Sequence, residues 1–101
     1  MKGVNLKKAL ELMGYKIVQY NKNYNYRSGF MTKGDQLYYF SYEDLRWDPT
    51  LMIRTADPTI KDKKGNYADY RGGQNTYPMN ELMRLGYRIH EPRQACDFNS
   101  N

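Results

Sequence analysis

One short pattern occurs twice in this chain and sets the outline of its fold. Residues 10–17 read Leu-Glu-Leu-Met-Gly-Tyr-Lys-Ile, residues 82–89 read Leu-Met-Arg-Leu-Gly-Tyr-Arg-Ile, and the two align without gaps. In each, an amphipathic helical pattern meets a glycine, which commonly ends a helix, and then residues that favour a strand. The pattern therefore predicts two helix-to-strand units that enclose the middle of the chain.

The repetition has two explanations. An internal duplication would produce it, but so would the general preference of helix-to-strand junctions for a glycine and an apolar strand start, and we favour the second. The first helix is expected to follow Asn5, a suitable N-cap, and to lead into a strand over residues 15–20. The second is expected to start after Thr76, with Pro78 near its first turn.

The middle of the chain is rich in strand-forming residues. Residues 24–31, 36–42 and 51–55 each predict a strand, because β-branched and aromatic residues are frequent in them. Residues 41–47 are expected to include a short helical turn, which ends before Pro49.

These elements predict an α+β fold in the order α-β-β-β-β-loop-α-β. We expect a mainly antiparallel sheet of about four to five strands with two helices on one face. A chain of 101 residues has room for one core, which places a single domain over residues 1–90. Residues 57–77 form a long basic loop within it, and residues 91–101 form a polar C-terminal tail.

Composition narrows the function classes. A net charge of +5 favours acidic partners such as nucleic acid, although many basic domains are only soluble, and the 11 tyrosines suit a binding face. Cys96 is the only cysteine, so the fold does not depend on a disulfide. No apolar stretch indicates a signal peptide or a membrane span, so we expect a cytoplasmic protein without a membrane partner.

The predicted hairpin presents two faces of different character. With a two-residue loop at residues 33–34, Arg27 lies opposite Phe40 on one face and Phe30 lies opposite Leu37 on the other. If the helices cover the face of Phe30, the other face becomes an aromatic platform on which bases can stack. The alternative is that this second face is the core, and Phe40 favours that alternative. The candidate residues on the platform are Arg27, Tyr38 and Tyr42.

The predicted loop carries a second candidate site. Arg71 is followed by Gly72 and Gly73 shortly before the second helix, and paired glycines next to a helix N-terminus can bring backbone N–H groups to an anion. The alternatives are a flexible turn and a solvated run of lysines. The remaining candidates for phosphate contact are Arg54, Lys61, Lys63 and Lys64.

Catalytic chemistry finds little support in the sequence. His90 is the only histidine, and Cys96 lies in the predicted tail, without a motif that orients the two as a pair. Glu43, Asp44 and Asp48 cluster around Trp47, where capping and turn roles explain the two aspartates better than a metal does. We therefore expect no enzyme, no cofactor and no metal site.

Two function classes remain open. The first, which we favour, is non-catalytic binding of nucleic acid, single-stranded DNA or RNA rather than a specific duplex site. The second is a protein–protein interaction module, such as a small phage or mobile-element inhibitor or adaptor, because Tyr, Met and Arg are enriched in interface cores. Nucleic-acid binding requires the cations and the tyrosines to share one continuous face.

Overall fold

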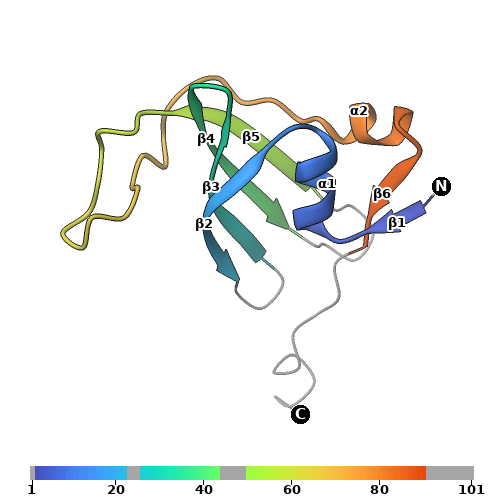
Figure 1. Ribbon diagram of the computed structural model, residues 1–101, viewed down its shortest axis with the longest axis horizontal. Helices are drawn as coiled ribbons and strands as arrows, with labels where there is room; N and C mark the ends of the chain where they lie inside the picture. The colour runs from blue at the N-terminus through green and yellow to red at the C-terminus, as the bar shows by residue number, and fades with distance from the viewer. Residues whose placement is uncertain (1, 23–25, 44–49, 91–101) are drawn as a thin grey trace, which may run out of the picture.

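The computed structural model describes residues 2–22, 26–43 and 50–90 of the chain (Figure 1). These residues form strands and short helices, which confirms the predicted α+β class. In chain order the elements are β1 (Lys2–Val4), α1 (Leu6–Leu12), β2 (Lys16–Lys22), β3 (Tyr26–Lys33), β4 (Gln36–Glu43), β5 (Thr50–Ala56), α2 (Met79–Arg84) and β6 (Tyr87–Ile89).

The main sheet is antiparallel, with its four strands in the order β2-β3-β4-β5. The predicted hairpin loop was wrong by one position. Lys33 pairs with Gln36, so the loop consists of Gly34 and Asp35, and Gly34 takes a φ of 62° at the first loop position, as a type II′ turn requires. Partners therefore differ by two residues from the prediction, and every side chain stays on its predicted face.

A second, two-stranded sheet joins the two ends of the described chain. In it β1 and β6 run parallel, with Gly3 opposite Arg88. Neither this pairing nor β1 itself was expected, and β6 does not join the main sheet. A three-residue strand is too short to carry the alternating pattern by which strands are recognised.

Both predicted glycine stops are confirmed. Gly14, with a φ of 96°, donates its N–H to the carbonyl of Glu11, and Tyr15 donates to Leu10, which is the Schellman arrangement of hydrogen bonds. Gly86, with a φ of 91°, ends the second helix in the same left-handed conformation. At the other end of α1, the side chain of Asn5 accepts the N–H of Lys8, as a helix cap does.

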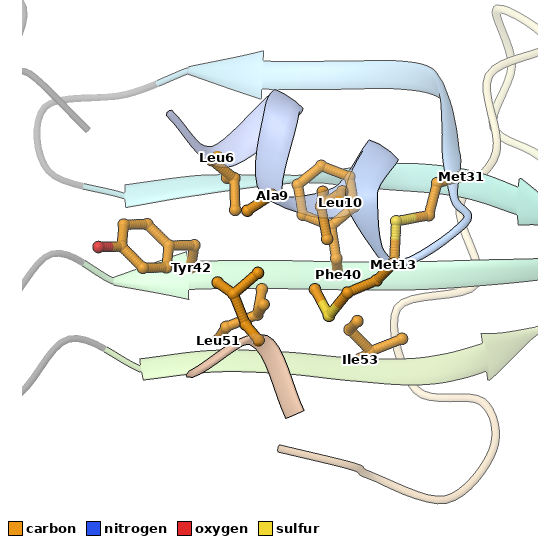
Figure 2. Close-up of a cluster of buried hydrophobic side chains, with 10 residues drawn as sticks. Leu6, Ala9, Leu10, Met13, Met31, Phe40, Tyr42, Leu51 and Ile53 are labelled. Atoms are coloured by element: carbon orange, nitrogen blue, oxygen red, sulfur yellow. The ribbon is translucent and has the colours of Figure 1, made fainter. Parts of the chain in front are cut away.

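The main core lies between the helices and one face of the main sheet (Figure 2). The helix α1 lies over the strands, and its buried side packs against the alternate residues of β3, β4 and β5 that face it (Figure 2). One buried residue of α2 joins the same cluster. Its fully or nearly buried members are Leu6, Ala9, Leu10, Met13, Met31, Phe40, Tyr42, Leu51, Ile53 and Leu82.

The first residues of the predicted helical turn, 41–43, are in a strand and not in a helix. Residues 41–43 belong to the strand β4 and continue its pairing with β3 and β5. Residues 44–49, with the carboxylates beside Trp47, lie outside the described residues, as does the predicted tail over residues 91–101.

Candidate functional site

The face predicted as an aromatic platform is the core face. Arg27 and Tyr42 are each 1% exposed and Phe40 is fully buried. Phe40 and Tyr42 pack in the main core against buried residues of the helices. Tyr38 is half-buried, with its ring edge-on to that of Tyr15 at a centroid distance of 5.3 Å. Of the two alternatives for this face, the structure shows the one that Phe40 favoured, a core face, and not an exposed platform. The physical reason is that this face holds more apolar surface to bury.

The opposite face carries aromatic rings of its own. Phe30 and Tyr39 stand on neighbouring strands, and the 57–77 segment folds back over them with Tyr67 and Tyr70. The centroid of Phe30 lies 5.3 to 5.7 Å from the centroids of the other three rings, and Tyr39 and Tyr70 meet edge to face at 5.5 Å. Phe30, Tyr39, Tyr67 and Tyr70 form what we call the outer aromatic cluster.

Access to the outer aromatic cluster is uneven. Phe30 and Tyr39 are buried beneath the segment, whereas the side chain of Tyr70 is 45% exposed. Tyr67 and Tyr70 were not predicted as site residues, although two tyrosines in an otherwise polar loop indicate that the loop packs against an apolar surface.

Side chains of the sheet and the loop hold the segment in place. The side-chain amide of Gln19 accepts the N–H of Tyr67 at 2.9 Å and donates to its carbonyl at 3.1 Å, as a neighbouring strand would. The carboxylate of Asp69 is buried and accepts the N–H of Asp57 at 2.7 Å, which closes the loop on itself. The loop is therefore a folded part of the domain.

The two adjacent glycines have a packing role. A Cβ at Gly73 would overlap the backbone and hydroxyl of Thr55, and one at Gly72 would overlap the carboxylate of Asp69. Beyond them Thr76 exchanges two backbone hydrogen bonds with Ile53, at 2.7 and 2.9 Å, so the loop covers the outer edge of β5. Phosphate contact by the glycine amides remains a prediction.

Two cations lie over rings of the outer aromatic cluster. The guanidinium carbon of Arg54 is 4.9 Å from the centroid of Tyr39, and the ammonium of Lys61 is 5.3 Å from that of Tyr67. Such contacts are typical cation–π geometry. The other loop cations, all exposed, are Lys63, Lys64 and Arg71.

The lysines occupy the projecting end of the segment, which extends away from the sheet in Figure 1. A bridge between Lys61 and Tyr67 closes this turn, and the carboxylate of Asp62 accepts two backbone N–H groups within it. These bonds lower the pKa of Asp62, chiefly through the N–H of Asn66, and keep it charged. The turn is thus a defined structure that presents lysines to solvent.

Two tyrosine hydroxyl groups, one from β3 and one from β4, meet on the outer face. The hydroxyl oxygens of Tyr26 and Tyr39 are 3.2 Å apart. Burial, followed by this hydrogen bond, raises the pKa of Tyr39 to about 12, so its ring stays neutral at physiological pH.

A cavity of about 480 Å³ opens on another part of the surface, at the junction of α1 and β2. Lys7 and Lys16 line it together with Glu11 and Tyr15. Because the carboxylate of Glu11 and the C-terminal end of the helix both oppose the two lysines, the cavity does not favour an anion.

The residues considered for catalysis lie only in part within the described residues. His90 is exposed, and its backbone N–H is bound to the carbonyl of Val4 at 2.7 Å. Cys96, Asp44 and Asp48 lie outside the described residues. Within residues 2–22, 26–43 and 50–90 no three His, Cys, Asp or Glu side chains come together as metal ligands would.

Comparisons with protein-family models, curated proteins and solved structures find no match to this chain. Neither of the helices in the described part of the chain has the length and apolarity that crossing a bilayer requires.

Proposed function

We propose that this protein binds nucleic acid, without catalysis, through the sheet face opposite the helices. The observation that carries the proposal is the pairing of cations with tyrosines there: Arg54 lies over Tyr39 and Lys61 over Tyr67, beside the exposed ring of Tyr70. Rings that stack on bases and cations that neutralise phosphates are the two components of sequence-tolerant binding to single strands.

The exposed lysines of the projecting turn extend this surface. Lys63 and Lys64 stand on the same turn as Lys61, and Arg71 follows Tyr70 directly. The proposal keeps these cations and Arg54 from the sequence prediction but replaces its stacking residues, because Arg27 and Tyr42 are buried. A net charge of +5 adds long-range attraction for a polyanion.

The test is fluorescence anisotropy with labelled single-stranded DNA, single-stranded RNA and duplex DNA over a salt series. We expect binding that weakens steeply with salt. Replacing Lys61, Lys63 and Lys64 by Gln is expected to weaken it and to reduce the slope of log affinity against log salt by about 2, given ~0.7 per phosphate contact on single strands.

A matched control removes the same charge elsewhere. It replaces Lys2, Lys7 and Lys8, which are exposed on β1 and α1, by Gln. An equal loss in the control variant would mean that net charge alone attracts the nucleic acid, and an absence of binding at low salt to all three ligands would refute the proposal.

A second candidate function is protein binding. Tyr77, Met83 and Leu85, in and around α2, are large apolar side chains exposed to solvent. Aromatic residues and Met are enriched at protein interfaces. Salt-insensitive capture of a protein partner, lost when Met83 and Leu85 are replaced by Ser, would favour this candidate over the first.

A further inference from the structure

We infer that Arg54, Tyr39 and Tyr70 form a subsite for one nucleotide with an unpaired base. In this subsite the guanidinium of Arg54 binds the phosphate and the ring of Tyr70 stacks on the base. The inference rests on the proposed function and adds to it the class of ligand, a flexible single strand, and a role for each residue.

Arg54 has binding capacity that its surroundings do not use. Its Nε atom is buried and has no hydrogen-bond acceptor among the described residues, and no carboxylate within the described residues forms an ion pair with it. Buried donors without a partner are rare in folded proteins, because each one loses its bond to water. Arg54 as a whole is only half-buried, so an anion would bind through the terminal nitrogens of the guanidinium and not through the buried Nε.

The ring of Tyr39 holds the guanidinium of Arg54 in position before a ligand binds. Tyr39 is buried and fixed between Phe30 and Tyr70, and the guanidinium carbon lies 4.9 Å from its centroid. An arginine held against a ring loses little conformational freedom when it binds a phosphate through two parallel hydrogen bonds. A lysine at position 54 would keep the charge and lose this geometry.

Tyr70 supplies the surface for the base. Its ring packs on Phe30 at 5.6 Å and on Tyr39 at 5.5 Å, yet the side chain remains 45% exposed. Arg54 and Tyr70 each contact the ring of Tyr39, so one ring links the two side chains. The subsite requires that a phosphate on Arg54 and the base attached to it on Tyr70 span this ring.

The geometry selects against a duplex. Bases in a duplex are stacked on one another and cannot offer a free face to Tyr70 without being flipped out. The projecting lysines attract any polyanion, whereas the subsite requires a base. These two contributions to binding can be separated experimentally.

The experiment compares two labelled oligonucleotides of equal length, one of thymidines and one abasic, with the same number of phosphates. We expect the wild-type protein to bind the thymidine strand about 10-fold more tightly, in line with the usual strength of base–aromatic stacking. Tyr70→Leu is expected to abolish this preference, and Tyr70→Phe to keep it. Arg54→Lys is expected to weaken binding of both strands by about 10-fold despite its unchanged charge.

The outcomes separate the inference from the proposed function. Equal affinity of the wild-type protein for both strands would overturn the subsite and leave salt-sensitive nucleic-acid binding in place. Arg54→Lys binding as tightly as the wild-type would overturn the role of the guanidinium. No binding of either strand at low salt would remove the proposed function, and the subsite with it. The wild-type comparison needs no variant, so it stands even if Tyr70→Leu fails to fold.

Discussion

At the scale of single residues, Gln19 has the most unusual role in the molecule. Both polar atoms of its amide are bound to the backbone of Tyr67, which lies 48 positions along the chain. One side chain thus takes the place of a strand in fixing the loop over the sheet. Its contribution is separable from packing, because the amide can be replaced by an isosteric carboxylate.

We predict that Gln19→Glu breaks the contact between this side chain and the backbone of Tyr67. A carboxylate accepts the N–H of Tyr67 but repels its carbonyl, so the free energy of unfolding should fall by about 1–2 kcal/mol. Amide hydrogen exchange at Tyr67 should become faster. Asn21→Asp, the same change in charge at an exposed position of the same strand, is the control, and an equal effect in both variants would contradict the assigned role.

Tyr39 makes the stability of the protein depend on pH in the alkaline range. Its pKa in the folded protein, raised to about 12, exceeds the ordinary value of 10.0. Below that ordinary value the phenol is neutral in both states and its contribution to stability is complete. As the pH rises above it, the unfolded chain ionises first, so stability is lost progressively up to the folded pKa.

We therefore predict that Tyr39→Phe loses less stability than the wild-type protein between pH ~10 and ~12, because the variant has no phenol to ionise at this position. Chemical denaturation at several pH values measures the difference. Tyr70→Phe, which removes the hydroxyl of an exposed tyrosine, should follow the wild-type curve. Parallel curves for Tyr39→Phe and the wild-type would show that Tyr39 does not control the alkaline loss.

At the scale of elements, the 57–77 segment does for one sheet face what the helices do for the other. It buries Phe30 and Tyr39 with its own tyrosines and covers the edge of β5 with Thr76. Glycines permit this close approach, because the segment passes directly over Thr55.

Two glycines of the segment allow a matched test of that approach. Gly65 and Gly73 both have a positive φ, but a Cβ at Gly65 meets open space and one at Gly73 overlaps Thr55. Alanine at either position incurs strain of about 1–2 kcal/mol from the left-handed backbone. We predict that Gly73→Ala lowers the free energy of unfolding by a further ~1–3 kcal/mol, because the overlap must be relieved. Equal losses in denaturant unfolding of the two variants would contradict the packing role.

Elements whose sequence signals are local could be predicted. Turn glycines, capping residues and alternation located α1, the hairpin of β3 and β4, and the ends of both helices. Alternation also placed each hairpin residue on its correct face. It could not decide which face the helices cover, because both faces carry aromatic rings and the choice depends on the apolar area that β5 and α1 add.

The site was harder to predict than the fold for the same reason. Tyr67 and Tyr70 reach Phe30 from a loop without periodicity, and the amide of Gln19 that holds them is remote in sequence. Of the residues proposed from sequence, Arg54 and Lys61 do lie beside tyrosine rings, but the rings are not those of Tyr38 and Tyr42.

At the scale of the whole molecule, the main sheet is covered on both sides by different means. Helices bury one face in a continuous apolar core, and a polar segment covers the other with a few rings. A covering that relies on side-chain hydrogen bonds and half-exposed tyrosines leaves polar groups and open rings at the surface. The asymmetry between the two faces is what makes the outer one suitable for a ligand.

The small parallel sheet has a consequence for how the chain folds. Lys2 pairs with Tyr87, so the two strands of this sheet are far apart in the sequence. The hairpins of the main sheet can form from neighbouring residues, whereas this pairing must close a loop that contains almost the entire domain. We therefore expect the contact between β1 and β6 to form after these hairpins, because it closes the longer loop.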